Sequence, residues 1–246
     1  MTTPELRTPR DRESWAQPVD RLTTTATGAG RDTVTGRRVA GPVQGFGQLW
    51  QKTFAIRVPA DEHPPEEVVA HWKAGFPTFW PGDARFYAPL SGIAPGEVAL
   101  LEIAPVPGSP VRMSTGVMVI YADRESFTFM TPEGHALSAW ITFSAYRDGD
   151  ETVAQAQALE RTADPLIELS YLFGANRAND RFWEQTLANL ARSLGVVEPV
   201  VQVRKVCVDR RRQWRYAGNV RYSAAVGMAV GTVTAPVRWF RRRRSA

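Results

Sequence analysis

Cysteine and histidine are scarce in this chain. It has one cysteine, Cys207, and three histidines among its 246 residues. A single thiol excludes an internal disulfide framework, and the histidines do not recur at the spacing of a zinc site. The sequence therefore predicts no metal site and no cofactor, and it fits a reducing, cytoplasmic setting.

Sequence motifs of the common hydrolases are missing as well. The chain contains neither the HExxH pattern of zinc proteases nor the GxSxG nucleophile elbow. Gly92, Gly96 and Gly108 lie in predicted loops and lack the spacing of a phosphate-binding loop. Enzymatic activity is therefore the weaker expectation, and binding is the stronger one.

Long apolar runs are also rare. The first twenty residues lack the apolar core of a secretion signal. Residues 222–237 form a run of sixteen residues without charge. As a helix this run would be about 24 Å long at about 1.5 Å per residue, which is shorter than the roughly 30 Å hydrocarbon core of a bilayer. The run is too short to predict a spanning helix, and whether it lies on, spans or avoids a membrane stays open.

Positive charge is concentrated at the C-terminal end. From residue 197 onward the chain has twelve Lys and Arg against two acidic residues. The net charge of the whole chain is +5, which leaves −5 for residues 1–196. A mildly acidic body thus precedes a strongly basic tail, residues 197–246. This asymmetry indicates an anionic surface as the partner of the tail.

The N-terminal 45 residues are rich in Thr, Arg, Gly and Pro. The stretch TTTATGAG, residues 23–30, has little apolar surface to bury, so the entropic cost of ordering it is not compensated. We expect a disordered or loosely attached arm over residues 1–45. Trp15 and Val39 are the side chains that can anchor this arm to the body.

An alternation of apolar and polar residues marks the start of the body, residues 46–196. Residues 50–58 alternate in this way and predict a half-buried strand. Two prolines and two glutamates at 64–67 then open a helix that ends at Pro77. Further strands are predicted at 99–103, 111–121 and 126–130.

The clearest pattern of the body is a predicted β-hairpin. Residues 137–146 place apolar side chains at the odd positions and mostly polar ones at the even positions, which buries one face of a strand. Asp148, Gly149 and Asp150 supply the turn, and residues 152–159 return as the partner strand.

A long, interrupted helix follows the hairpin. Asp164 can cap it, with Pro165 at the first helical position. Leu166, Leu169 and Phe173 form one apolar face before Gly174 interrupts the pattern. Apolar residues recur at helical spacing from residue 183 until Gly195 ends the helix, and residues 197–208 then form an extended linker that can add an edge strand.

Five segments between residues 41 and 196 carry a family resemblance, namely GPVQGFGQLWQKTF, FPTFWPGDARFYAPLSGIAPGEVALLEI, STGVMVIYAD, SFTFMTPEGHALSAWITFSA and DRFWEQTLANLA. With the order of the elements, they resemble the helix-grip superfamily, also called SRPBCC. This superfamily includes START lipid-transfer domains, Bet v 1-like plant proteins and polyketide cyclases. The segments resemble a bacterial branch of this superfamily from which no residue role carries over.

The resemblance implies an α+β fold. An antiparallel sheet would curve around the long C-terminal helix, and a cavity would lie between sheet and helix. The superfamily usually has seven strands, and six are predicted above. Residues 85–90 are the candidate for the remaining strand.

Seven residues are candidates for lining this cavity. A histidine can act as an acid, a base or a ligand contact, although a solvated loop histidine explains His135 as well. Aromatic rings can stack on a flat ligand or simply fill the core, and the charged candidates are equally consistent with surface ion pairs. The candidates are Trp80, Arg85, Tyr87, Glu102, Arg112, His135 and Trp140.

The end of the tail combines basic and aromatic residues, as interfacial membrane anchors do. Each basic residue near an anionic membrane contributes on the order of 1 kcal/mol, so the cluster outweighs the weak apolar run. A disordered extension that binds nucleic acid through phosphates is the alternative, and the sixteen uncharged residues make it the less favoured one. The expected membrane contacts are Arg221, Arg238, Trp239, Phe240, Arg241, Arg242, Arg243 and Arg244.

Three functions follow from this organisation. The favoured one is binding or transfer of an apolar small molecule or lipid in the central cavity, with the tail at the anionic inner face of the cell membrane. The second is a cyclase-like or hydrolase-like enzyme that uses His135, Glu102 or Tyr87. The third is a protein-interaction scaffold that the tail positions at a membrane.

Overall fold

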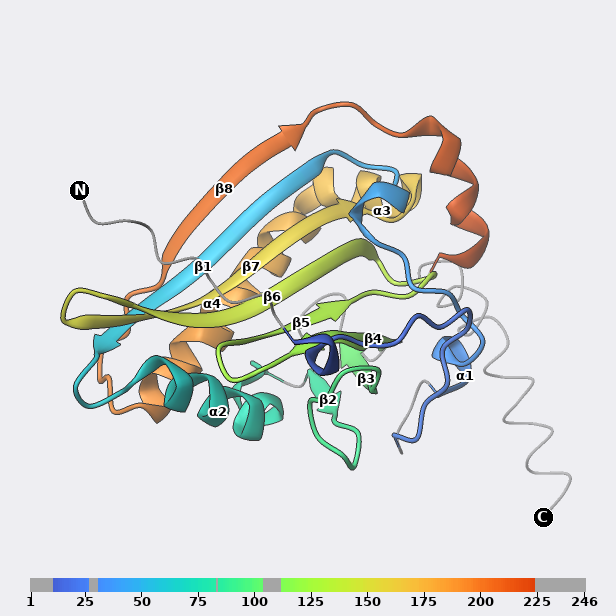
Figure 1. The fold of residues 1–246 in the computed structure, drawn as a ribbon. Coiled ribbons are helices and arrows are strands. Elements are labelled where there is room, and N and C mark those ends of the chain that lie inside the picture. Colours follow the sequence, from blue (N-terminus) through green and yellow to red (C-terminus); the bar gives the residue numbers. More distant parts are fainter. Residues whose placement is uncertain (1–10, 27–30, 83, 104–111, 224–246) are drawn as a thin grey trace, which may run out of the picture.

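The computed structural model describes residues 11–26, 31–82, 84–103 and 112–223 (Figure 1). In these residues, eight strands form one antiparallel sheet with the order β2-β3-β4-β5-β6-β7-β1-β8. The strands are β1 Leu49–Pro59, β2 Arg85–Tyr87, β3 Val98–Ile103, β4 Met113–Ala122, β5 Ser126–Met130, β6 Leu137–Asp148, β7 Glu151–Thr162 and β8 Gln202–Asp209. The α-helices are α1 Arg31–Val34, α2 Pro65–Gly75, α3 Pro165–Ser170 and α4 Asn176–Ser193.

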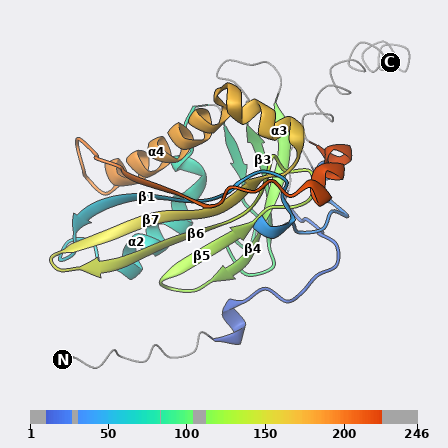
Figure 2. The same ribbon diagram turned by 90° about the horizontal axis from the view of Figure 1, so that it is seen from above.

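The sheet curves around the long helix α4 (Figure 2). Helices α2 and α4 pack on the same face of the sheet and contribute to one hydrophobic core with β1 and β3–β7. The predicted fold class, an α+β helix grip, is confirmed by this arrangement. Strand β2 supplies the additional pairing that the sequence placed at residues 85–90.

The β6–β7 hairpin has the longest register of the sheet. Its pairs run from Leu137 opposite Thr162 to Asp148 opposite Glu151. Gly149 in the turn has a φ of +63°, a left-handed conformation that glycine adopts without strain. The predicted hairpin is confirmed, and both strands extend beyond the predicted ends.

A kink divides the predicted long helix into α3 and α4. Asp164 caps α3 because its Oδ1 accepts hydrogen bonds from the amides of Leu166, at 2.8 Å, and Ile167, at 3.1 Å. The π-helical turn Tyr171–Ala175 joins the two helices, and Gly174 in it has a φ of +107°. Gly174 therefore interrupts the helix where the sequence predicted an interruption.

Aromatic rings fill the space between the sheet and the two helices. Phe127 and Phe143 stack with their ring centroids 4.8 Å apart, and the edge of Trp72 from α2 packs on both. Phe76 contacts the same pair of rings through its edge. The sheet and the helices thus enclose a packed aromatic interior.

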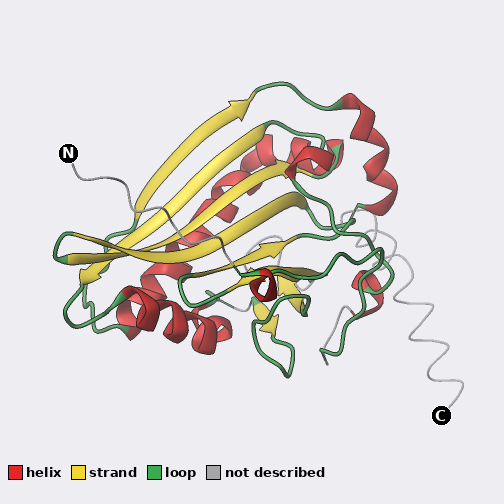
Figure 3. Ribbon diagram, viewed as in Figure 1, coloured by secondary structure: helices red, strands yellow, loops and turns green. Residues whose placement is uncertain are grey.

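Residues 11–26 and 31–45 pack on the opposite face of the sheet, which differs from the expected loose arm. Leu22, Ala26 and Val34 are buried in a second core with residues of β3 and β4. These residues run across the face of the sheet that is opposite to α4 (Figure 3). Both faces of β3 and β4 are therefore covered, and their nearly continuous apolar sequences are explained.

The two anchors expected in the arm both contact the body. Trp15 forms an isolated bridge with Tyr121, and their ring centroids lie 4.8 Å apart. Val39 bridges Pro132. The division of the chain at residue 46 stays a prediction, but in the structure the chain on both sides of it contributes to the packed fold.

Residues beyond 196 extend the sheet. Strand β8 pairs antiparallel with β1, from Leu49 opposite Asp209 to Ala55 opposite Gln202. The 3-10 helix Trp214–Tyr222 follows, and the ring of Trp214 packs edge-on against buried Phe46. The first part of the basic tail is thus built into the edge of the body.

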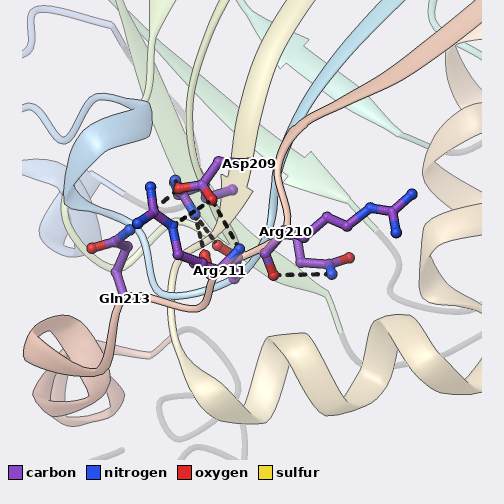
Figure 4. A network of polar contacts seen from close by, with 7 residues as sticks. Asp209, Arg210, Arg211 and Gln213 are labelled. Carbon is purple, nitrogen blue, oxygen red and sulfur yellow. Dashed lines mark hydrogen bonds and ion pairs between the residues drawn. The ribbon is translucent and has the colours of Figure 1, made fainter.

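A polar network fastens β8 to β7 (Figure 4). The guanidinium of Arg161 is buried; its Nη2 lies 2.7 Å from Asp209 Oδ2 and its Nη1 lies 2.9 Å from the Arg211 carbonyl oxygen. The Arg211 amide, followed by the Arg161 side chain, lowers the pKa of Asp209 to about 2. Asp209 is therefore a carboxylate at neutral pH, as the pairing with Arg161 requires.

A buried ion cluster fastens α4 to the sheet. Nζ of Lys52 on β1 lies 2.7 Å from Glu160 Oε1 on β7 and 2.9 Å from Asp180 Oδ1 on α4, and it donates to Asn176 Oδ1 at 2.8 Å. Burial lowers the pKa of Lys52, but Glu160 and Asp180 raise it by more, so the net shift is upward. Lys205 on β8 lies 2.5 Å from the second oxygen of Asp180.

We expect Lys52→Met to lower the free energy of unfolding by about 3–5 kcal/mol, because Glu160 and Asp180 then stay buried without their shared cation. Urea unfolding of K52M measures the loss. The triple variant K52M/E160Q/D180N should recover most of it, since no buried charge is left unpaired. Arg57→Met, which removes an exposed ion pair, is the matched control and should change the midpoint little. A K52M midpoint equal to that of the wild type contradicts this role.

A chain that ends at residue 196 is expected to unfold at a lower temperature than one that ends at residue 223. The shorter chain leaves Arg161 without Asp209 and exposes the edge of β1. Thermal unfolding followed by circular dichroism compares the two. Equal midpoints would show that β8 and the following 3-10 helix do not contribute to the stability of the body.

Candidate functional site

Two of the predicted cavity residues meet on the outer face of the sheet. Tyr87 Oη donates a hydrogen bond to Glu102 Oε2 at 2.9 Å. Arg85, which is exposed, lies directly opposite Glu102 in the β2–β3 register. Tyr87 packs with the second core under the arm. The pair therefore lies on the face away from α4, outside the aromatic interior.

Trp140 also lies outside this interior. Trp140 on β6 is exposed and alternates with the buried residues Ala139 and Phe143, so its side chain is on the outer face. Arg112 is half-buried and directly precedes β4. A ligand-binding role for these residues stays a prediction.

Trp80 is the predicted cavity residue that lies in the aromatic interior. The 3-10 helix Phe76–Phe79 delivers it from the end of α2, and the Asn189 amide on α4 donates to the Phe79 carbonyl oxygen at 3.0 Å. The ring of Trp80 packs edge-on against Phe86 at 5.3 Å and Phe182 at 5.0 Å between centroids. It thus lies between β2 and α4.

Three buried donors in this region lack an acceptor among the described residues. They are Nε1 of Trp72, Nε1 of Trp80 and Nδ2 of Asn179. Trp72 and Trp80 both belong to the aromatic core. A buried N–H group without a partner costs about 1–3 kcal/mol, and such groups are uncommon in native proteins. The interior therefore combines apolar walls with donors that remain available to a bound acceptor.

Sequence reasoning did not single out Trp72 and Asn179. Trp72 lies in the helix that the sequence predicts between residues 64 and 77, on the face that packs into the core. The missing acceptor of its indole N–H is a property of the surrounding side chains. Since the core around Trp72 is built from strands β1–β7 and from helices α2 and α4, no local pattern in the sequence reveals it.

His135 lines a separate pocket with a volume of about 160 Å³. This pocket lies where the loop after β5 meets the start of α3 and the 3-10 helix Trp214–Tyr222; Ser138, Asp164 and Asn219 also line it. Its walls include neither Tyr87 nor Glu102. The three residues predicted as catalytic alternatives are thus not brought together.

The chemistry of His135 follows from its burial. Its Nδ1 lies 3.0 Å from the amide nitrogen and 3.1 Å from the carbonyl oxygen of Leu137. Burial lowers the pKa of His135 to about 4, and the hydrogen bond to Leu137 opposes this shift in part. The imidazole is therefore neutral at pH 7 and is a weak base, which makes it a poor general base.

Most of the predicted membrane contacts lie outside the described residues. Arg221 is described; it is exposed, and its Nε donates to the Gly218 carbonyl oxygen. Among the described residues no helix has both the length and the apolar character needed to cross a membrane, and no group of three or more His, Cys, Asp or Glu is placed to hold a metal ion. The contacts outside are Arg238, Trp239, Phe240, Arg241, Arg242, Arg243 and Arg244.

Comparisons with known proteins give structural likenesses only. No family model matches the chain, and no curated protein matches it. A crystal structure of protein Ms6760 from Mycobacterium smegmatis is similar at 12% identity and a TM-score of 0.41, over 59% of this chain and 92% of that one. Superfamily membership therefore stays a prediction at the level of sequence.

Two similar structures have names that state a chemistry. Norcoclaurine synthase from Thalictrum flavum has 16% identity and a TM-score of 0.37, over 66% of this chain and 96% of that one. The di-domain aromatase/cyclase StfQ from the steffimycin biosynthetic pathway has 11% identity and a TM-score of 0.40, over 59% of this chain and 52% of that one. This chain thus matches about half the length of StfQ, and at these TM-scores the likenesses carry no argument about activity.

We expect the free energy of unfolding to fall by about 3 kcal/mol between pH 6.5 and pH 4 through His135 alone, because the unfolded chain binds a proton there that the folded protein excludes. Below the folded pKa both states are protonated and the loss stops growing. His135→Asn retains an acceptor near the Leu137 amide but does not titrate in this range, so it should lack this part of the pH dependence.

Urea unfolding at a series of pH values measures the difference between H135N and the wild type. His71→Asn changes an exposed histidine that bonds to Ser193 and is the matched control. The same decline in H135N as in the wild type contradicts the assignment.

Proposed function

We propose that the protein binds a small, flat and mostly apolar molecule that carries a hydrogen-bond acceptor, and that its basic tail holds it near an anionic membrane. The binding site is the aromatic interior between the sheet and α4. The observation that carries the proposal is the pair of buried indole N–H groups, of Trp72 and Trp80, which have apolar surroundings and no acceptor among the residues that the structure describes.

The energetics favour a ligand that combines a ring with a carbonyl. Ring faces and edges supply aromatic contacts on all sides of a flat molecule. A carbonyl oxygen would accept from an indole N–H that otherwise has no partner, so the ligand recovers a cost that the free protein bears. A purely hydrocarbon ligand of the same shape recovers none of it.

The packed rings limit the size of the ligand and its route. The rings of the interior contact one another, so a ligand has to displace packed side chains. Trp80 lies at the margin of the core, between β2 and α4, and retains slight exposure to solvent. Entry beside Trp80 disturbs the fewest deeply buried rings.

The membrane half of the proposal is supported by the charge of the tail. Twelve Lys and Arg against two acidic residues follow residue 196. An anionic surface attracts such a segment, and the attraction falls off within a Debye length, so it is sensitive to salt. A position at the membrane would bring the protein close to its ligand, because apolar molecules partition into membranes.

An enzymatic function has less support in the described residues. His135 has a pKa of about 4 and lies in a different pocket from Tyr87 and Glu102. The Glu102 carboxylate already accepts the Tyr87 hydroxyl. The three catalytic candidates His135, Tyr87 and Glu102 therefore do not meet in the aromatic interior, and the buried Lys52 is already paired with Glu160 and Asp180. Binding is the function we propose.

Two ligands of nearly equal shape test the site. We expect 2-acetylnaphthalene to bind about three- to tenfold more tightly than 2-ethylnaphthalene, because only the ketone accepts an indole hydrogen bond. Trp80→Phe should reduce this preference while leaving the hydrocarbon bound. Trp140→Phe, on the exposed outer face, is the matched control and should retain the preference. Titration calorimetry measures each affinity; equal affinities, or no binding of either compound, contradict the proposal.

A further inference from the structure

The helical face that the sequence marks as apolar points into solvent. Leu166 and Leu169 on α3 are 44% and 51% exposed, and Leu172 and Phe173 in the following π-helical turn are 69% and 84% exposed. Neighbouring Ile167 is buried. These four residues, Leu166, Leu169, Leu172 and Phe173, form a protruding apolar patch that we term the α3 knuckle.

The knuckle is held outward by specific contacts. Asp164 caps α3 through two amides, so the helix begins at a defined angle. Glu168 accepts from Thr162 Oγ1 at 2.8 Å and from Arg212 Nε at 2.8 Å, which fixes the opposite side of the helix. Gly174, with a φ of +107°, turns the chain between the knuckle and α4. The exposure is thus a consequence of the fold.

Basic residues flank the knuckle. Arg177 and Arg181, on the first turns of α4, are exposed. The start of the tail packs at the same end of the molecule, since Asn219 Nδ2 donates to the Ala163 carbonyl oxygen at 3.0 Å and Arg212 pairs with Glu168. Among the nearby acids, Asp164 and Asp180 are buried and Glu168 is paired with Arg212. Glu184 lines a surface pocket with Arg181 and offsets part of its charge, so Arg177 is the stronger basic contact.

We infer that the α3 knuckle inserts among the headgroups of an anionic membrane, with Arg177 and Arg181 against the lipid phosphates. Exposed leucine and phenylalanine beside arginine is the composition of interfacial membrane contacts. A second copy of the chain is the poorer occupant, because two identical basic faces repel each other. The inference extends the membrane half of the proposed function to the folded body and does not depend on the tail.

Vesicle sedimentation of the full-length chain tests the inference. The two vesicle types are phosphatidylcholine alone and phosphatidylcholine with three tenths phosphatidylglycerol. The double variant L172S/F173S is expected to bind the anionic vesicles about ten- to a hundredfold more weakly than the wild type, since two large apolar side chains no longer leave water. The double variant R177Q/R181Q should bind several-fold more weakly, and added salt should remove that difference.

Matched controls show whether weaker vesicle binding results from loss of the knuckle or from another change in the protein. L90S/V197S removes two residues that are 94% and 89% exposed elsewhere on the surface, and it should bind as the wild type does. A full-length variant with Arg238, Arg241, Arg242, Arg243 and Arg244 replaced by Gln tests the tail separately. If this variant binds normally and L172S/F173S does not, membrane contact through the tail is contradicted and membrane contact through the knuckle is supported.

Several outcomes overturn the inference. One is L172S/F173S binding to anionic vesicles as tightly as the wild type while its circular dichroism shows an intact fold. Another is a wild-type dimer that L172S/F173S converts to a monomer, which assigns the patch to a second copy. A third is vesicle binding that is lost completely when residues 224–246 are removed, which assigns the membrane contact to that segment and not to the knuckle.

Discussion

The arrangement of this protein depends on one buried cation. Lys52 points from β1 into the core, where apolar residues occupy the neighbouring inward positions, and it is held by Glu160 of β7 and Asp180 of α4. A charge in that place is tolerated because both carboxylates and the Asn176 side chain accept hydrogen bonds from its ammonium group. The cluster thereby determines where α4 crosses the sheet. It also connects Asp180 to Lys205, so the edge strand β8 is coupled to the same helix.

The position of α4 decides what the two faces of the sheet can do. On its side, Trp80 and the surrounding rings form an interior whose only unsatisfied groups, among the described residues, are N–H donors and none are acceptors. On the other side, the arm covers β3 and β4 and buries the Tyr87–Glu102 pair. The residues that the sequence assigned to one cavity consequently lie in different places. Trp80 is on the α4 side of the sheet, Tyr87 and Glu102 are on the other side, and His135 lines a separate pocket. His135, Tyr87 and Glu102 are therefore not brought together, and the interior next to Trp80 is the region for which we propose recognition by shape and one hydrogen bond.

Much of this architecture was predictable, because short-range patterns report it directly. The alternation in residues 137–146 and the glycine turn at 149 predicted β6 and its partner β7, and Asp164 with Pro165 predicted the start of α3. Position 52 was also informative. It lies on the same side of strand β1 as Phe54 and Ile56, which are buried, so a lysine there indicates a buried charge with partners. Those partners were not predictable, since Glu160 and Asp180 lie more than a hundred residues away along the chain. The arm was predicted loose because residues 23–30 look polar, yet Leu22 and Ala26 find a surface that only the folded sheet presents.

By itself, the sequence determined the class of fold, the interruption of the last helix at Gly174, and the separation of an acidic body from a basic tail. These properties depend on periodicity, backbone preference and net charge, which are local or additive. The tertiary structure alone decided which face each side chain occupies relative to its distant neighbours. The apolar residues of α3 illustrate the difference: their spacing marks a helix face, but Ile167 takes the inward position and Gly174 turns the chain. Leu172 and Phe173 are left in solvent for that reason, and no pattern within α3 contains this information.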